Sequence, residues 1–141
     1  MTEMESSLVL IKPDAVKNGQ SGQIINRFEQ LGLRMVALKM LHMDRDLAEK
    51  HYAIHRDKPF FQELVNYMTS APIIAAVFVG KDAVAKIRRE MGATDPNKAE
   101  PGTIRAEFGL DVTRNAVHGS DSAETAAKEI RLFFRDDEIF Y

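Results

Sequence analysis

The stretch Pro72-Ile73-Ile74-Ala75-Ala76-Val77-Phe78-Val79-Gly80 is the strongest strand signal in the chain. An uninterrupted apolar run between a proline and a glycine predicts a β-strand over residues 73–79. A second apolar run, Leu8 to Ile11, is typical of a strand that is buried on both faces. Pro13 disfavours helix at the residue before it, so Lys12 is expected to be extended at the end of this strand.

The segments around these runs carry the spacings of helices and of one more strand. Met35 to Leu41 predicts the further strand, and Asp46 with Glu49 has capping-box spacing before a helix through Ile54. The remaining helices are expected from apolar stripes: Ile24, Ile25, Phe28 and Leu31 before Gly32; Phe61, Leu64, Val65 and Met68 after Pro59; Asp82 to Met91 before Gly92; and Ala123, Ala126, Ala127, Ile130, Phe133 and Phe134 from Ser122 onward. These elements predict an α/β layer structure in which helices cover a sheet.

Size and charge narrow the class of protein. The 141 residues, 45% of them hydrophobic, predict a single domain over residues 1–141. Lys and Arg number 19 against 21 Asp and Glu, so the broad basic surface of a nucleic-acid binder is not expected. Any bound anion should therefore be small and held by a few focused residues.

The composition also excludes several kinds of site and location. The chain has no cysteine, which excludes disulfides, thiolate zinc sites and cysteine nucleophiles and fits a reducing compartment. The acidic, polar start does not resemble a signal peptide, and no segment approaches the roughly 20 apolar residues of a membrane span. We therefore expect a cytoplasmic protein that does not bind membranes.

The stretch from Gly92 to about Asn115 shows little periodicity. Asp95-Pro96 and Pro101-Gly102 mark turns in it. Unstructured loops longer than about 12–15 residues are usually functional or disordered in a compact domain. Because this one mixes Thr94, Arg105 and several apolar residues, we expect a functional loop.

His118 is the candidate nucleophile. It precedes Asp121 and Ser122, either of which could cap the last helix, so it should lie near a helix N-terminus that favours anions and disfavours imidazolium. A neutral imidazole with a free lone pair is the form that attacks phosphorus. The alternative is a histidine that is simply hydrogen-bonded within a turn.

Glu129 could orient that imidazole. It stands alone on one border of the last helix's apolar face and could reach back past Ser120, as a third group orients the base of a catalytic triad. The alternative is an ordinary surface carboxylate.

Phosphate-binding motifs of the usual kinds are missing. There is neither G-x-x-x-x-G-K-S/T nor G-x-G-x-x-G after a strand, so side chains would have to hold phosphates. Lys12, Arg88 and Arg105 are separated candidates, each of which could instead be a solvated charge. Phe60 falls off its helix's apolar face and is either an exposed stacking surface or part of a satellite cluster.

Two partial motifs are rejected. Two tripeptides resemble protein-kinase motifs: His55-Arg56-Asp57 matches the catalytic loop, and Glu107-Phe108-Gly109 partly matches D-F-G. However, the Gly-rich loop is absent and the chain is too short for two lobes. His51 and His55 share a helix face, but the glutamate of H-E-x-x-H and a third ligand are missing, so no metal ligands are expected.

Several motifs in order resemble one known family. Asn115 to Ser122, N-A-V-H-G-S-D-S, is similar to the signature around the phosphorylated histidine of nucleoside diphosphate kinases. I-K-P-D-A-V at 11–16, K-P-F-F at 58–61, G-A-T-D-P at 92–96 and P-G-T-I-R at 101–105 extend the resemblance over nearly the whole chain. Asn18 and Gln20-Ser21 depart from the family where basic and apolar residues are frequent, at positions without a catalytic role.

The resemblance implies a fold and an activity. The fold would be α+β, ferredoxin-like βαββαβ, with a four-stranded antiparallel sheet covered by helices and a long nucleotide-site loop. The activity would be reversible γ-phosphoryl transfer from a nucleoside triphosphate to a nucleoside diphosphate, in ping-pong fashion through phospho-His118. Broad base specificity would follow because stacking accepts any base.

The resemblance also implies roles for single residues. Lys12, Arg88, Thr94 and Arg105 would contact the phosphates, Asn115 and Lys12 the ribose 3′ hydroxyl, and Phe60 the base. Tyr52 would lie close to His118, and Ser120 and Glu129 would position its ring. Mg²⁺ would be carried on the nucleotide phosphates, and the chain would form a homo-oligomer, as a tetramer or hexamer or alternatively a dimer.

Two rival functions remain at this point. One is a catalytically silent family member that acts as a binding module, although each expected site residue is present. The other is a ferredoxin-like nucleic-acid-binding domain, which would need exposed aromatics on a central strand, whereas residues 73–79 carry one aromatic and no charge.

Overall fold

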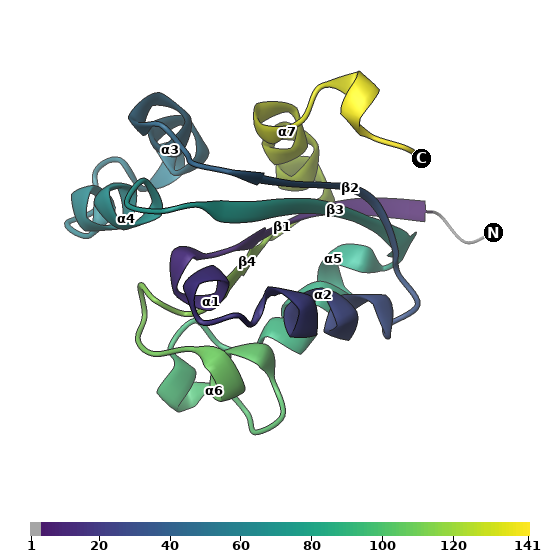
Figure 1. The fold of residues 1–141 in the computed structure, drawn as a ribbon, viewed down its shortest axis with the longest axis horizontal. Helices are drawn as coiled ribbons and strands as arrows, with labels where there is room; N and C mark the ends of the chain where they lie inside the picture. Colours follow the sequence, from purple (N-terminus) through teal and green to yellow (C-terminus); the bar gives the residue numbers. More distant parts are fainter. Residues whose placement is uncertain (1–3) are drawn as a thin grey trace.

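The computed structural model describes residues 4–141 and is built around a four-stranded sheet with the order β2-β3-β1-β4 (Figure 1). The strands are β1 (Met4–Ile11), β2 (Arg34–Leu41), β3 (Ile73–Lys81) and β4 (Val117–Gly119). The helices are α1 (Pro13–Lys17), α2 (Ser21–Glu29), α3 (Arg45–His51), α4 (Phe61–Met68), α5 (Ala83–Met91), α6 (Ile104–Phe108) and α7 (Ala123–Phe133), with short 3-10 turns η1 (Ala53–His55), η2 (Pro96–Lys98) and η3 (Asp136–Glu138). The start of the chain, on which the signal-peptide expectation rests, lies partly outside the described residues.

All paired strands are antiparallel. β1 and β3 form the centre, with Val9 opposite Ala76, and β2 and β4 flank them. This arrangement confirms the predicted ferredoxin-like sheet. The register also places His118 opposite Leu10, so the short strand β4 fixes the histidine beside the C-terminal end of the central strand β1.

Alternation along β1 explains why its whole apolar run is buried. Leu8 and Leu10 belong to a core cluster with side chains of α3, α4 and α7, whereas Val9 and Ile11 belong to a second cluster with α2, α5 and α6. Figure 1 shows these helices in layers on opposite sides of the sheet. The prediction of a strand buried on both faces is confirmed, because successive side chains point to opposite faces.

Some helix predictions need correction. α2 ends at Glu29, so Leu31 packs from the following turn rather than from the helix. The cap of α3 is Asp44, whose carboxylate accepts a hydrogen bond from the Leu47 N–H at 2.8 Å; Asp46 is the second residue of the helix. α3 ends at His51, and the expected helix through Ile54 is replaced by the turn η1, because the backbone tightens after Tyr52.

The last helix presents a narrower apolar face than expected. Ala126, Ile130 and Phe133 are buried, but Ala123 and Ala127 are exposed. Ser122 caps α7 by accepting from the Thr125 N–H at 3.0 Å, as one of the two expected caps. Glu129, on the border of the face, is buried.

The segment 92–115 is not the structureless loop that the sequence predicts. It contains η2 and α6, and Thr103 caps α6 by accepting from the Ala106 N–H. Gly92 has a φ of 84°, and a Cβ there would lie 2.5 Å from the Thr103 hydroxyl oxygen. The segment therefore packs tightly against the end of α5. Its short helices begin at side-chain caps rather than following an apolar period, which is why the sequence pattern did not reveal them.

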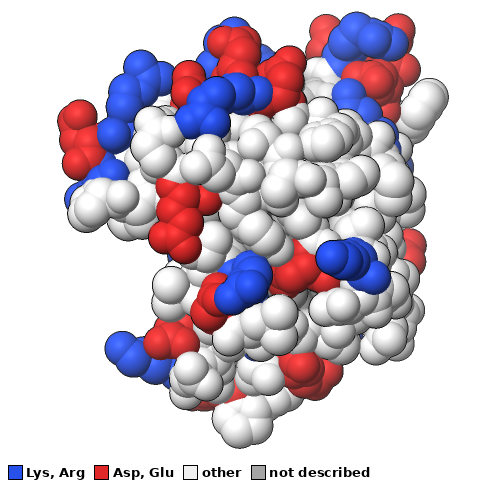
Figure 2. All heavy atoms as spheres, turned by 60° about the vertical axis from the view of Figure 1, so that its left-hand side comes forward, with Lys and Arg blue, Asp and Glu red and all other residues white. Residues whose placement is uncertain are grey.

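Charges are interspersed on the surface. Figure 2 shows Lys and Arg beside Asp and Glu on the face it presents, with a wide uncharged area between them. No helix within residues 4–141 combines the length and the hydropathy that crossing a bilayer requires.

Candidate active site

A cavity of about 560 Å³ lies at the end of the sheet where β1 ends and β4 begins. It is lined from several distant parts of the chain: the end of β1, α3 and η1, the start of α4, α5, the 92–115 segment, β4 and α7. Nine of the ten predicted site residues line it: Lys12, Tyr52, Phe60, Arg88, Thr94, Arg105, Asn115, His118 and Glu129. Ser120 lies behind the histidine.

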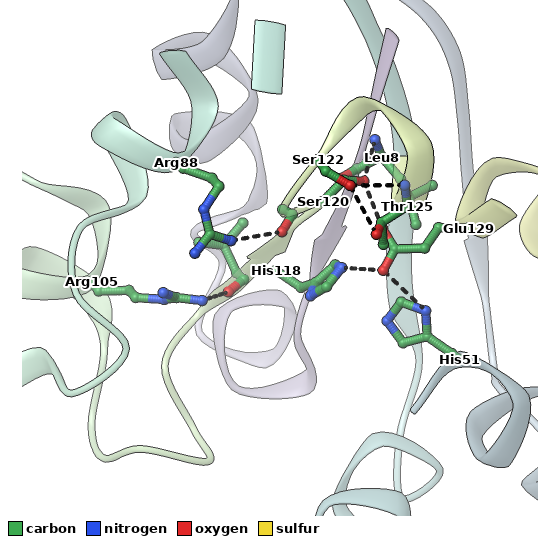
Figure 3. Close-up of polar contacts among 11 residues, drawn as sticks. Leu8, His51, Arg88, Arg105, His118, Ser120, Ser122, Thr125 and Glu129 are labelled. Atoms are coloured by element: carbon green, nitrogen blue, oxygen red, sulfur yellow. Dashed lines mark hydrogen bonds and ion pairs between the residues drawn. The ribbon is translucent and has the colours of Figure 1, made fainter. Parts of the chain in front are cut away.

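His118 is held by a carboxylate from α7 (Figure 3). Its Nε2 lies 3.0 Å from Glu129 Oε2, and the Ser120 hydroxyl donates to Glu129 Oε1 at 2.6 Å. Ser120 is itself fixed to β1, because its Oγ accepts from the Leu8 N–H at 3.1 Å. With Nε2 engaged, Nδ1 has no hydrogen-bond partner among residues 4–141, and the ring is partly exposed to the cavity.

Close packing of α5 side chains on β4 places a cation beside this histidine. A Cβ at Gly119 would lie 2.5 Å from Met91 Sδ and 2.9 Å from Ile87 Cγ2, so the glycine leaves room for these two side chains against β4. Arg88 on α5 thereby reaches the Gly119 carbonyl, with 3.5 Å between nitrogen and oxygen.

Lys12 and Arg105 are buried cations at the same cavity. Burial, followed by the nearby Arg105, lowers the pKa of Lys12 to about 8. Arg105 donates to the carbonyls of Val117 at 2.8 Å and Gly92 at 3.1 Å, and burial, then Arg88, lowers its pKa to about 10. Positive charges that depress one another's pKa values mark a site shaped for an anion.

The amide of Asn115 and the residue Thr94 are linked in the cavity wall. Asn115 Nδ2 donates to the carbonyls of Thr94 at 2.9 Å and Val112 at 3.2 Å. Its Oδ1 is buried without a partner among the described residues, so this oxygen remains available to a ligand hydroxyl.

Aromatic and imidazole rings form the opposite wall. His51 contacts the His118 ring edge-on with centroids 4.7 Å apart, and its Nδ1 lies 3.7 Å from Glu129 Oε2. Burial, then His118, lowers the pKa of His51 well below its usual value, so it is neutral. Burial, then Glu129, raises the pKa of the Tyr52 phenol. Phe60 is 45% exposed beside the cavity rather than buried in a satellite cluster.

The sequence reasoning missed Asp14 and Tyr67. Ala116, directly before β4, has a φ of 74°, which is unfavourable for a residue with a side chain. Its N–H donates to Asp14 Oδ2 at 3.0 Å, and the Tyr67 hydroxyl donates to Asp14 Oδ1 at 2.6 Å. The motif Lys12-Pro13-Asp14 contained the available signal: an acidic residue in the first turn of a helix, directly after a buried strand.

The histidines also group differently from the pair weighed in the sequence. His51 lies with His118 and Glu129, with one ligand atom of each within 4.8 Å of the others, and His55 is not part of this group. The reason is that α3 ends at His51, so the two histidines no longer share one helix face.

The fold and the site together define a class: a ferredoxin-like domain with a carboxylate-oriented histidine facing a cluster of cations. The family model described as nucleoside diphosphate kinase matches residues 5–139. The chain therefore belongs to the nucleoside diphosphate kinase family.

Relatives and solved structures match this chain over nearly its full length. A nucleoside diphosphate kinase of Dehalococcoides mccartyi is 57% identical over 136 residues, which is 96% of each chain, and one of Archaeoglobus fulgidus is 55% identical, over 96% of this chain and 90% of its own. The crystal structure of the Aquifex aeolicus enzyme is similar with a TM-score of 0.94 at 44% identity, covering 97% of this chain and 99% of that one. The Halobacterium salinarum enzyme in complex with CDP has a TM-score of 0.95 at 46% identity, covering 99% and 93%.

Proposed function

We propose that this protein is a nucleoside diphosphate kinase that transfers a γ-phosphoryl group from a nucleoside triphosphate to a nucleoside diphosphate through phospho-His118. One observation carries the proposal: the His118 ring is fixed through Nε2 by Glu129, while its Nδ1 faces a cavity that also contains Lys12, Arg88 and Arg105. The reaction is ping-pong, because one histidine serves both half-reactions.

The chemistry of the first half-reaction follows from the two ring nitrogens. The Nδ1 lone pair attacks the γ-phosphorus, a nitrogen–phosphorus bond forms, and the bond to the β,γ-bridging oxygen breaks, leaving a nucleoside diphosphate. The ring becomes positive, and its Nε2 proton stays hydrogen-bonded to the Glu129 carboxylate, which stabilises that charge. In the second half-reaction, a terminal phosphate oxygen of the acceptor nucleoside diphosphate attacks the phosphorus of phospho-His118. The nitrogen–phosphorus bond breaks, and Nδ1 regains its lone pair.

The cations position and neutralise the phosphates. Phosphoryl transfer depends mainly on positioning and on stabilising charge spread over the oxygens. Lys12 after β1, Arg88 on α5, and Arg105 with the hydroxyl of Thr94 in the 92–115 segment provide donors from three parts of the chain around the ring. Arg105 is held by two backbone carbonyls, so its guanidinium is oriented before the nucleotide arrives.

The base and the ribose occupy the outer part of the cavity. Phe60 stacks on the base, and stacking contributes about 1–3 kcal/mol with any base, so specificity is broad. Asn115 Oδ1 and Lys12 would reach the ribose 3′ hydroxyl. Tyr52 packs edge-on against His51, which in turn contacts the His118 ring. The Halobacterium salinarum relative is in complex with CDP, which supports nucleotide binding by this chain.

Mg²⁺ fits this cavity only as a companion of the nucleotide. It prefers oxygen ligands, and among the described residues the lining carboxylates are Asp121 and Glu129, of which Glu129 is already bonded to His118 and Ser120. The phosphates would therefore hold the ion, without direct protein ligands, and it would supply further charge neutralisation there.

A labelling experiment tests the function. The protein is incubated with γ-labelled ATP and Mg²⁺ without acceptor, and GDP is then added. We expect acid-labile, alkali-stable label on the protein, its transfer to GTP, and no label on a His118→Ala variant. A folded, ATP-binding protein that takes up no label would instead be a silent member of the family.

The proposal includes a homo-oligomer that works in the cytoplasm. The edge strand β2 exposes Leu38 by 48% and Met40 by 61%, and such apolar edges are usually covered. Light scattering during size-exclusion chromatography distinguishes a tetramer or hexamer from the alternative dimer. Microscopy of a fluorescent fusion tests the cytoplasmic location.

A further inference from the structure

His51 is a buried histidine that the proposed reaction leaves without a hydrogen-bonding role. Its side chain is 1% exposed, and neither ring nitrogen has a hydrogen-bond partner among residues 4–141. A buried polar group without a partner is costly, so its presence needs an explanation. Figure 3 shows the ring beside the Glu129 carboxylate, on the side away from Ser120.

His51, His118 and Glu129 together offer the kinds of ligand atom that a transition-metal site uses. Two imidazoles and a carboxylate are ligands that zinc accepts, with an open position left for water. The two nitrogens lie 3.0 Å (His118 Nε2) and 3.7 Å (His51 Nδ1) from Glu129 Oε2, and one ligand atom of each residue lies within 4.8 Å of the others. Ligands on a tetrahedral zinc at about 2.0–2.1 Å from the ion are about 3.3 Å apart, so small side-chain rotations would close the site.

We propose that His51, His118 and Glu129 bind a divalent transition metal of the zinc type, and that this metal switches off the phosphoryl-accepting histidine. The consequence for His118 rests on the proposed function. A metal on Nε2 uses the lone pair of that nitrogen, so the single proton of the neutral ring must move to Nδ1. Nδ1 then has no lone pair for phosphorus, and no net proton is released from the ring.

The site distinguishes this metal from the ion carried by nucleotides. Mg²⁺ prefers oxygen ligands, whereas imidazole suits zinc. Lys12 and Arg105 line the same cavity, and their positive charges disfavour the binding of a metal cation. The affinity for zinc should therefore be lower than that of structural zinc sites. Weak, reversible binding is what a switch on a working enzyme requires.

Metal binding is measured first, on the nucleotide-free enzyme, so that zinc–nucleotide complexes do not interfere. Zinc is titrated calorimetrically into the wild type, His51→Gln and Glu129→Gln, with His42→Gln as a matched control, because His42 is exposed and bonds to the Thr69 carbonyl. We expect one zinc per chain and no change in His42→Gln. The two site variants each lose a direct ligand, so their affinity should fall by more than the roughly 10- to 100-fold that loss of an outer-shell partner costs. Equal affinity of the wild type and a folded site variant would overturn the proposal.

Two further readouts report the geometry and the switch. Co²⁺ in place of zinc should give visible absorption bands of a low-coordinate ion in the wild type that are absent in His51→Gln. Free zinc set by a metal buffer should slow phosphoenzyme formation in proportion to occupancy, and a zinc-selective chelator should restore it. Zinc that binds through His51 without slowing this step would contradict the switch, whereas zinc-free enzyme that takes up no label would contradict the function itself.

Discussion

The charge of Lys12 depends on what occupies the cavity. Its pKa of about 8, lowered by burial and by Arg105, lies below the value of 10.5 for a free lysine, so part of the empty enzyme carries a neutral Lys12 near pH 8. Bound phosphates supply negative charge and raise this pKa again. Nucleotide binding above pH 8 should therefore take up a proton.

Calorimetry in two buffers with different ionisation enthalpies measures this proton. We expect uptake at pH 8.5 by the wild type and much less by Lys12→Met, at matched saturation. Between pH 8 and 10.5 the unfolded chain binds more protons than the folded one, so the contribution of Lys12 to stability increases as pH rises through this window. An identical slope of stability against pH in Lys12→Met would refute the assignment.

Glu129 stabilises the positive ring that forms during transfer. In Glu129→Gln the amide oxygen can still accept from His118 Nε2, but the negative charge is lost. Hydrogen bonds to charged groups contribute about 1.5–3 kcal/mol, and 1.4 kcal/mol is a factor of ten. Rapid-quench measurement should show phosphoenzyme forming roughly 10- to 150-fold more slowly, with Glu124→Gln on the exposed face of α7 as the control.

At the scale of elements, the short strand β4 depends on the turn before it. The turn is held in a left-handed conformation at Ala116 by the Asp14 carboxylate, which is held in turn by α4 through Tyr67. β1, α1 and α4 thus fix the direction in which β4 starts, and therefore where His118 lies.

Removing one hydroxyl should loosen this connection. Tyr67→Phe leaves the Asp14 carboxylate without its 2.6 Å donor, and a lost partner of this kind costs about 1–3 kcal/mol. Urea unfolding should show this loss, and phosphoenzyme formation should slow, whereas Tyr141→Phe, at an exposed position, should change neither. Addition of Ala116→Gly, which accepts a positive φ, should restore part of the rate; a rate that stays low would mean that Tyr67 acts by another route.

At the scale of the whole molecule, the site and the fold are one cooperative unit. The cavity takes side chains from both helical layers and from both ends of the chain, so it exists only when the sheet and its layers are assembled. A ligand of this cavity binds the native state and not the unfolded chain.

A nucleotide should therefore stabilise the whole domain. At a nucleoside diphosphate concentration 100 times Kd, the free energy of unfolding should rise by about 2.7 kcal/mol, as followed by circular dichroism. Phe60→Ala should reduce the stabilisation at fixed concentration by a similar amount for purine and pyrimidine nucleotides. A loss confined to purines would contradict the stacking role.

Local patterns of the sequence predicted much of this architecture. The runs at Leu8–Ile11 and residues 73–79 are strands, Gly92 ends α5, and Ser122 caps α7, because each signal acts through neighbouring residues. Motifs in order further indicated the residues that the cavity brings together. Some errors were local, such as the cap of α3 at Asp44, but others fell where a distant contact is involved, as at the end of α3, where the His51 side chain is buried against Phe133 and His118.

The sequence by itself determined the burial of Leu8–Ile11 on both faces of the sheet and, through motifs that resemble one family, the residues expected at the site and the chemistry expected of His118. Only the tertiary structure decided which ring nitrogen of His118 is free, and that buried His51 is neutral. It also decided the lowered pKa of Lys12 and the hydrogen bonds from Ala116 and Tyr67 to Asp14. The physical reason is range: propensity and periodicity act over a few residues. Hydrogen bonds and burial at this site join residues as much as 112 positions apart.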